Sequence, residues 1–208
     1  MLTERQVRVL DAATARLIPG PDDDPGEAGH PGAREAGVVG YIDALLGALD
    51  GDPPRVFAGG PFSDRNGTSS DDMQRFVELD EHELVTWRAR IAELRRRYAE
   101  GVDALDARAG GDFASASPAR QDAVLAEDPG GFTALLMGHA IEGMYGNPEY
   151  GGNAALAGWD DIGFRGDTQP RGFTASEVSQ SDGPDPLVID GPVEAVLALM
   201  AFRAAAED

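Results

Sequence analysis

The sequence has no cysteine and no lysine in its 208 residues. Without cysteine, the chain lacks disulfides, thiol catalysis, thiolate-bound iron–sulfur clusters and cysteine-based zinc sites. Histidine is also scarce, because only His30, His82 and His139 occur, which leaves little material for an all-histidine metal site. The longest strongly apolar stretch, around 195–202, falls far short of the roughly 20 residues that a membrane-spanning helix requires.

The charge of the chain is strongly one-sided. All 17 basic residues are arginine, and with 37 acidic residues they give a formal net charge of −20. Nucleic acids and anionic membrane surfaces are bound by clusters of basic side chains. The composition therefore predicts no nucleic-acid partner and no anionic-membrane partner. The length, with 42% hydrophobic residues, suits a single domain over residues 1–208.

Apolar residues recur at helical spacing in several places, and nowhere at the two-residue spacing of a strand, so the predicted fold class is all-α. The pattern from Thr3 to Gln6 is typical of a capping box that starts the first helix. Pro31 and Pro118 stand at the expected first turns of two later helices. Five or six helices are expected, at about 3–17, 31–49, 84–105, 118–126, 132–145 and 192–205.

The helix predicted at 84–105 carries its apolar residues in steps of three and four along one seam. Gly101 falls on this seam, where a missing side chain permits the close approach of a neighbouring helix. Glu93 and Arg97 stand four residues apart, in the order that favours an ion pair along a helix. We expect the seam to pack within the chain's own domain, in preference to a coiled-coil partner.

Glycine and proline, by contrast, are abundant, with 27 and 14 residues. They concentrate in two regions, 50–80 and 146–190, which are expected to form long loops. Long loops inside a compact domain usually have a function. The second region is expected to be an irregular, partner-facing loop that wraps around the helical part of the chain, residues 2–145.

Motifs of several enzyme classes are missing. No dinucleotide fingerprint follows a strand, and neither a phosphate-binding loop nor a Gly-x-Ser-x-Gly motif occurs. His139 and Glu142 lie three residues apart on a predicted helix, where they could ligate a metal together with groups from other helices. A di-iron bundle needs two Glu-x-x-His motifs and two further glutamates, whereas this chain has one such motif, reversed. A satisfied core or interface histidine is the simpler interpretation, and a stand-alone, metal-dependent helical enzyme is the rival.

The most informative stretch runs from His139 to Phe164. An Asn-Pro turn follows a helix there, and a Gly-Gly-Asn triplet then gives the backbone unusual freedom. Large aromatic side chains on such a loop pack either against the chain's own helices or into a protein interface. These side chains are Tyr150, Trp159 and Phe164.

This stretch resembles the gluconate 2-dehydrogenase subunit 3 family, the small subunits of bacterial flavin-dependent sugar dehydrogenases. The specific part is the series from Tyr150-Gly-Gly-Asn153 through Trp159 to Gly163-Phe164. Weaker matches occur in the same order elsewhere, so the resemblance covers about residues 2–173. They are Arg16–Pro19, Pro31–Val38, Gly59–Ser63, Tyr98–Asp106, and Ser117-Pro118 with Gln121.

The resemblance implies a non-catalytic small subunit rather than an enzyme in its own right. Such subunits bind, stabilise and help to mature a large FAD-containing subunit of the glucose–methanol–choline type, which oxidises a sugar or a related alcohol. Some complexes add a cytochrome c subunit as the electron acceptor. This chain is then expected to hold no cofactor and no metal itself, because FAD belongs to the partner.

The contact with that partner is expected along the segment 147–164, with Tyr150 and Trp159 as buried anchors. His139 and Glu142 are assigned to the same interface or, in the rival hypothesis, to a metal. The residues assigned to the partner contact are Asn147, Pro148, Tyr150, Gly151, Gly152, Asn153, Trp159, Gly163 and Phe164.

Members of the family commonly carry a twin-arginine export signal, and this sequence departs from that pattern. Residues 1–6 contain neither paired arginines nor an apolar stretch, so they do not resemble a signal peptide. As the sequence stands, it predicts a cytoplasmic protein. A periplasmic location, reached by export with a partner that carries the signal, is the alternative.

Overall fold

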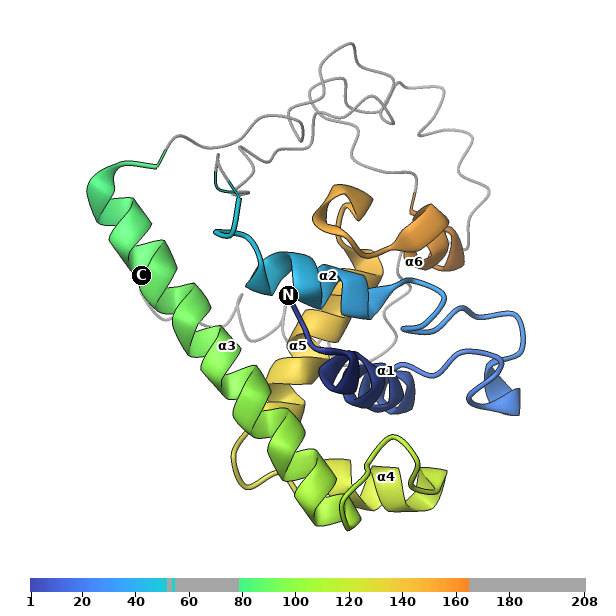
Figure 1. Cartoon of the computed structure of the whole chain (residues 1–208). Coiled ribbons are helices and arrows are strands. Elements are labelled where there is room, and N and C mark those ends of the chain that lie inside the picture. Colours follow the sequence, from blue (N-terminus) through green and yellow to red (C-terminus); the bar gives the residue numbers. More distant parts are fainter. Residues whose placement is uncertain (52–53, 55–78, 165–208) are drawn as a thin grey trace, which may run out of the picture. The chain divides into compact units, whose positions relative to one another are not determined.

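The computed structural model describes residues 1–51, 54 and 79–164, and all of them fall within one compact unit (Figure 1). These residues form six α-helices and no strand, which confirms the predicted all-α class. The α-helices are α1 (Glu4–Leu17), α2 (Val38–Leu46), α3 (Glu81–Ala109), α4 (Pro118–Ala126), α5 (Phe132–Tyr145) and α6 (Ala157–Asp161). Three 3-10 turns accompany them, η1 (Pro25–Glu27), η4 (Pro148–Tyr150) and η5 (Ala154–Leu156).

Part of the predicted architecture lies outside the described residues. This applies to the final helix predicted at 192–205, to residues 165–190 of the wrapped loop, and to nearly all of the loop at 50–80. The last of these includes the family-like segment Gly59–Ser63.

Short polar side chains start the helices close to where the sequence predicts them. Thr3 accepts a hydrogen bond from the backbone N–H of Gln6, whose side chain accepts one from the Thr3 N–H, so the capping box is confirmed. Ser117 caps α4 through its side chain. A second capping box, formed by Asp80 and Glu83, starts α3 slightly earlier than the apolar seam predicted.

Helix α2 begins at Val38, whereas the sequence predicted a start at Pro31. The residues between them form turns, because Gly37 has a left-handed backbone with φ of 66° and a helix cannot continue through it. Within these turns, the Ala33 N–H donates to the Ile18 carbonyl at 2.9 Å. The segment that resembles a helix start therefore ties the end of α1 to α2.

The segment after α5 is more regular than the irregular loop predicted from the sequence. It contains η4, η5 and the five-residue helix α6. Asn153, Ala155 and Leu156 have positive φ, so the helical path of the backbone is interrupted at these residues. Such a backbone is uncommon for residues other than glycine and persists where surrounding contacts hold it. The predicted lack of helical structure is therefore wrong for residues 148–150 and 154–161.

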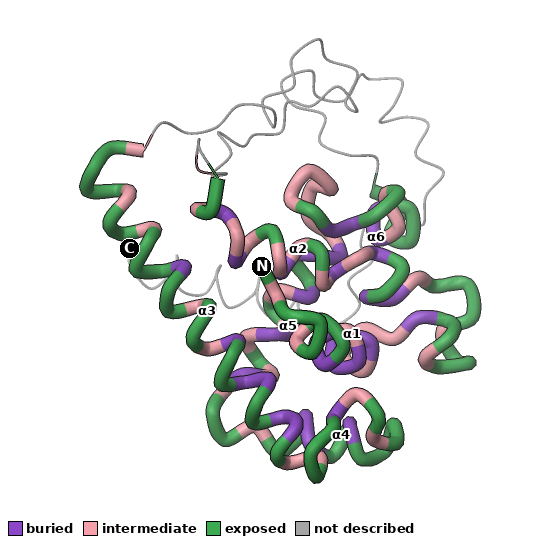
Figure 2. The backbone as a smooth tube through the Cα atoms, viewed as in Figure 1, coloured by how far each residue is buried: buried purple, intermediate pink, exposed green. Residues whose placement is uncertain are grey.

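The core lies where α1, α2, α3 and α5 face one another, and Figure 2 shows the buried positions along these helices. Helices α2 and α5 make the most extensive contact, while α4 packs against α1 and α3. Burial of a large apolar side chain contributes roughly 1.5–3 kcal/mol, so this cluster is the main stabilising element. The largest fully buried side chains include Leu10, Ile42, Tyr98, Leu105, Phe113, Leu136 and Met144.

The apolar seam of α3 packs within its own domain along its second half, as predicted. Tyr98, Val102 and Leu105 are fully buried there. Gly101 receives the ring of Phe132 from α5, and a Cβ atom at this position would overlap that ring. The close approach at Gly101 therefore involves an aromatic side chain rather than the backbone of a neighbouring helix.

The predicted ion pair between Glu93 and Arg97 is replaced by another. Arg96 bonds to Glu93 and to Glu100, each at 2.6 Å, three and four residues away along the helix. Arg97 instead donates to the Gly131 carbonyl at 3.3 Å, directly before α5. Arg97 thus bonds to the residue before α5 and not to Glu93, because the sequence alone does not show which element lies next to α3.

A nearly buried carboxylate joins α1, α3 and the turn before α4. Asp106 accepts from two guanidinium nitrogens of Arg5, at 2.8 and 2.7 Å, and from the N–H of Phe113 at 2.9 Å. The side-chain amide of Gln121 donates to the Phe113 carbonyl at 3.0 Å. Hydrogen bonds that involve a charged group contribute more than neutral ones. Asp106 and Gln121, which carry part of the family resemblance, therefore have structural roles.

Candidate functional site

The segment 147–164 folds back onto α2 and α5 (Figure 1). Asn153 holds it there and is fully buried. Its backbone N–H donates to the Gly143 carbonyl at 2.6 Å, and its side-chain amide donates to the Gly146 carbonyl at 3.0 Å. Its side-chain oxygen accepts from the Gly158 N–H at 3.0 Å. Leaving one of these buried groups without a partner would cost about 1–3 kcal/mol. The bonds of Asn153 therefore hold the segment against the end of α5.

Glycines of the segment permit this close approach. A Cβ atom on Gly152 would overlap the Gly143 carbonyl, and one on Gly158 would overlap the Met144 carbonyl. Gly151 has a φ of 98°, which favours glycine over other residues. The need to fit the segment against the chain's own helices is therefore enough to explain these three glycines.

The Trp159 indole belongs to the same internal packing. It is 5% exposed, and its Nε1–H donates to the Tyr145 carbonyl at 2.7 Å. The ring of Phe164 meets it edge-on, with 5.0 Å between centroids. Trp159 is thus buried by its own chain, and its burial does not depend on the partner surface that the sequence suggested for it.

The predicted contact residues consequently divide into three groups by burial. Phe164 is 45% exposed and is the largest exposed side chain among them. Contact with a partner along this segment stays a prediction, and the exposed residues are its remaining candidates. Gly152, Asn153 and Trp159 are buried; Asn147, Pro148 and Tyr150 are half-buried; Gly151, Gly163 and Phe164 are exposed.

His139 and Glu142 are each hydrogen-bonded to a tyrosine. His139 Nδ1 lies 2.7 Å from the Tyr98 hydroxyl, and the two rings stack with 5.8 Å between centroids. The Tyr41 hydroxyl donates to the Glu142 carboxylate at 2.6 Å. Burial lowers the pKa of His139, so the neutral ring can accept the Tyr98 hydrogen. Burial and the Glu142 carboxylate raise the pKa of Tyr41 well above its usual range, which keeps its hydroxyl protonated.

These bonds bear on the rival hypothesis of a metal site. Within residues 1–51, 54 and 79–164, no group of three or more potential metal-ligating side chains comes together. His139 and Glu142 would supply only two ligands, and each of them already bonds to a tyrosine. The contacts therefore favour the interpretation of His139 as a satisfied histidine at the edge of the core.

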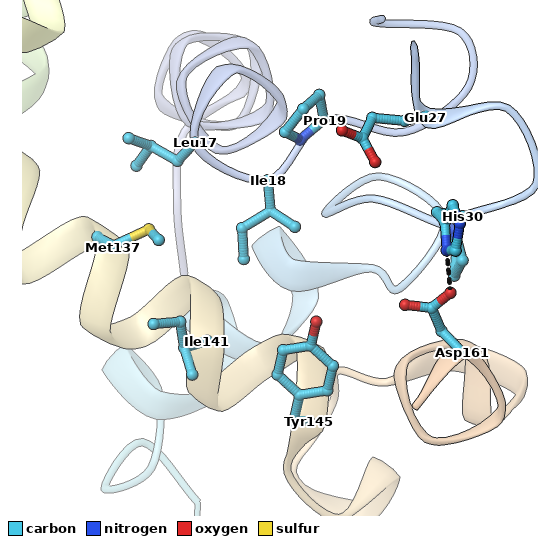
Figure 3. A pocket seen from close by; sticks show the side chains of 10 residues that line it. Leu17, Ile18, Pro19, Glu27, His30, Met137, Ile141, Tyr145 and Asp161 are labelled. Atoms are coloured by element: carbon cyan, nitrogen blue, oxygen red, sulfur yellow. Dashed lines mark hydrogen bonds and ion pairs between the residues drawn. The ribbon is translucent and has the colours of Figure 1, made fainter. Parts of the chain in front are cut away.

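A pocket that the sequence did not predict lies between the end of α1, the turns around η1 and helix α5 (Figure 3). Its volume is about 340 Å³. At its edge, His30 Nδ1 lies 2.7 Å from the carboxylate of Asp161 in α6. This carboxylate raises the pKa of His30. The lining residues are Leu17, Ile18, Pro19, Glu27, His30, Pro31, Met137, Ile141, Tyr145 and Asp161.

One sequence signal does point to this pocket. Met137, Ile141 and Tyr145 follow one another at four-residue spacing, so they share one face of α5. Their face lies beside the one that enters the core through Leu136 and Ala140. The pairing of residues 30 and 161, by contrast, has no local pattern that could reveal it.

The sequence profile of the gluconate 2-dehydrogenase subunit 3 family matches residues 4–166, which is well over half of the chain. The chain belongs to this family. The match includes every helix in the described ranges and ends just after Phe164. No curated protein and no solved structure matches the chain.

Membership of the gluconate 2-dehydrogenase subunit 3 family implies that the chain is a subunit of a dehydrogenase complex and has a partner dehydrogenase subunit. The resemblance based on residues 139–164 is thereby confirmed. Among the helices of the described part, none is both long enough and apolar enough to cross a bilayer.

Proposed function

We propose that this chain is the non-catalytic small subunit that binds, stabilises and helps to mature an FAD-dependent dehydrogenase of the glucose–methanol–choline type. The substrate of that enzyme would be a sugar or a related alcohol, and FAD would be held by the partner alone. In complexes that contain one, a cytochrome c subunit would accept the electrons. The observation that carries the proposal is the family match over residues 4–166.

The described contacts support an accessory role in a second way. His139 and Glu142, the pair at the centre of the metal hypothesis, are engaged by Tyr98 and Tyr41. Asp106, another carboxylate of the family-like pattern, is engaged by Arg5 and by a backbone N–H. These bonds give each of the three side chains a structural role that requires neither a substrate nor a metal.

The partner contact is proposed to involve the exposed end of the segment 147–164. Phe164 offers an aromatic face, and aromatic side chains are enriched at the centres of protein interfaces. Tyr150 and Pro148, which are half-buried, would lie at the edge of the contact. Asn153 and Trp159 would support this surface from inside the chain.

The test is a gene deletion in the native cells, followed by purification of the dehydrogenase subunit. We expect the deletion strain to yield much less dehydrogenase with bound FAD, measured by flavin absorbance and by activity. A plasmid copy of this chain should restore both, and a tagged copy should bring the yellow dehydrogenase subunit with it. Normal amounts of active, FAD-loaded dehydrogenase without this chain would contradict the proposal. So would metal-dependent turnover by the chain alone, which the rival hypothesis predicts.

A further inference from the structure

We propose that the pocket of Figure 3 is the docking site for the partner dehydrogenase subunit, and that it receives an apolar side chain flanked by arginine or lysine. We call this site the α1–α5 groove. The inference rests on the proposed function, because it assigns the surface through which that partner binds. It adds a second contact that the family-like segment 147–164 did not suggest.

Two facing walls of the groove are apolar and come from the end of α1 and from α5. Figure 3 shows Ile18, at the end of α1, on the opposite side of the pocket from Ile141 and Tyr145 of α5. Ile141 is 45% exposed, although it stands in the middle of a helix whose other face enters the core. The other apolar side chains of the lining are half-buried, and apolar side chains that gather in a depression are typical of a protein-binding site. Leu17, Pro19 and Met137 complete the apolar lining.

The charged side chains of the groove lining are two carboxylates, Asp161 and Glu27, and one histidine, His30, which pairs with Asp161. Asp161 and Glu27 stand at its edge. The nearest arginines in the sequence, Arg16 and Arg34, are already paired with aspartates. Residues 17–31 and 132–164 contain no arginine or lysine, and their acidic residues are Asp22, Asp23, Asp24, Glu27, Glu142, Glu149, Asp160 and Asp161.

This combination identifies the chemistry of the occupant. Complementary charge steers association and excludes partners of the same sign, so an acidic edge fits a basic flank on the partner. Of the polar groups in the lining, His30 and Asp161 already bond to each other, which leaves the Tyr145 hydroxyl and the Glu27 carboxylate. A volume of about 340 Å³ suits the insertion of one or two large side chains. Together with the partner subunit that the family membership implies, these features favour a protein segment over a small molecule.

The groove is also continuous with the surface already assigned to the partner. Ile162 and Phe164 are exposed apolar residues directly after Asp161, which lines the groove. The bond between His30 and Asp161 fixes the turns around η1 to α6 and so holds the two edges together. One partner surface can thus cover the groove and the exposed end of the segment 147–164.

The test compares Ile141→Arg with Val85→Arg, a matched control. Val85 is an exposed β-branched residue on α3, 60% exposed, and it does not line the groove. Arginine is a good helix former, and at position 141 it meets acidic neighbours, so both variants should keep the wild-type melting temperature. Affinity is measured by calorimetry with the FAD-containing dehydrogenase subunit that co-purifies with the wild-type chain. We expect Ile141→Arg to bind at least about tenfold more weakly, and Val85→Arg to bind within about twofold of wild type.

Each result decides between the two proposals. If the wild-type chain binds the dehydrogenase and Ile141→Arg binds it equally well, the groove assignment is overturned while the proposed function stands. Equal weakening by both variants also overturns it, because the effect is then not specific to the groove. If no dehydrogenase binds to the wild-type chain, both proposals fail together.

A second measurement covers the case in which Ile141→Arg fails to fold. Benzoylphenylalanine at position 141 is photo-crosslinked in the complex, and the crosslinked peptide is identified by mass spectrometry. The groove proposal expects a dehydrogenase peptide that contains arginine or lysine near the crosslinked residue. A crosslink only within this chain, or to a dehydrogenase peptide without a basic residue, would overturn it.

Discussion

At the scale of single residues, Trp159 and Phe164 show how two adjoining aromatic rings can have different roles. Trp159 is covered by its own chain and bonds to a backbone carbonyl, whereas Phe164 covers one edge of it and remains half open to solvent. We expect Trp159→Ala to lower the free energy of unfolding by about 3–5 kcal/mol, because it removes a large buried side chain. Phe164→Ala should cost about 1 kcal/mol, the contribution of an aromatic pair at the surface.

Chemical denaturation followed by circular dichroism measures both changes. Binding to the dehydrogenase subunit separates them further, because Phe164→Ala should weaken it roughly tenfold in a chain that remains folded. If Phe164→Ala binds like wild type, the segment 147–164 contributes to the fold alone. A stable Trp159→Ala chain would show instead that the indole is not part of the internal packing.

Two histidines are predicted to respond to pH in opposite directions. The hydrogen bond to Asp161, and then its charge, raise the pKa of His30, so the stabilisation from this pair is complete below the ordinary histidine pKa. It is lost as the pH rises through the raised value. Burial lowers the pKa of His139, so its contribution is complete above the ordinary pKa and decreases as the pH falls through the lowered value.

An NMR titration of the histidine ring protons measures both values in one experiment. We expect His30 to titrate at a higher pH than His139. In Asp161→Asn, the pKa of His30 should fall toward about 6.5, while that of His139 should stay unchanged as the internal control. A His30 pKa that does not respond to Asp161→Asn would show that the pair at the groove edge does not form in solution.

At the scale of helices, glycine has opposite effects at two helix-interior positions. A Cβ atom at Gly138 in α5 would meet no atom within 4 Å, whereas one at Gly101 in α3 would overlap the Phe132 ring. Gly138→Ala should therefore raise the free energy of unfolding by about 0.5–1 kcal/mol through helix propensity alone. Gly101→Ala gains the same propensity, but overpacking costs about 1–3 kcal/mol, so the net change should be destabilising. Urea denaturation of the two variants checks the signs, and equal stabilisation by both would contradict the packing of Phe132 on α3.

The helices that the sequence predicts well are those with local signals. Capping side chains at Thr3 and Ser117, together with an apolar period, place α1 and α4 almost to the residue. Helix α2 starts later than predicted because the left-handed Gly37 leaves no mark in the apolar pattern. Helix α6 has five residues, too few for independent stability, and depends on the bonds that Asn153 makes with α5.

The candidate site likewise has residues that the sequence identifies and contacts that it does not. The sequence identifies Tyr150, Trp159 and Phe164 as aromatics that need a surface, but it does not say whose surface, because both interpretations need the same residues. Burial of Trp159 by α5 answers the question for that residue. The α1–α5 groove depends on residues 17–31 meeting residues 137–161 in space. Such long-range contacts are set by packing, and a single sequence does not record them.

At the scale of the whole molecule, the excess of acidic side chains destabilises the folded state. The net charge is −20, and the acidic side chains repel one another when folding brings them together. In the part of the chain that the structure describes, the ion pairs that oppose this repulsion are mostly exposed, and such pairs contribute about 0–1 kcal/mol each. They involve Arg5, Arg16, Arg34, Arg95 and Arg96. Most of the acidic residues therefore have no arginine to neutralise them, since the chain has 17 against 37.

Salt screens the repulsion among acidic side chains more than it screens the attraction within arginine–carboxylate pairs, and the last prediction follows from this difference. At about 0.01 M ionic strength the Debye length is about 30 Å, so acidic residues across the domain repel one another, whereas at about 0.1 M it is about 10 Å. Pairs in direct contact are screened less than charges far apart. Raising NaCl from about 0.01 to 0.2 M should therefore stabilise the chain by on the order of 1 kcal/mol, or about 2–4 °C in melting temperature. Thermal unfolding followed by circular dichroism measures this, with sucrose as an uncharged control. A melting temperature that falls with NaCl would show that the arginine–carboxylate pairs, rather than the excess negative charge, dominate the electrostatic free energy of the fold.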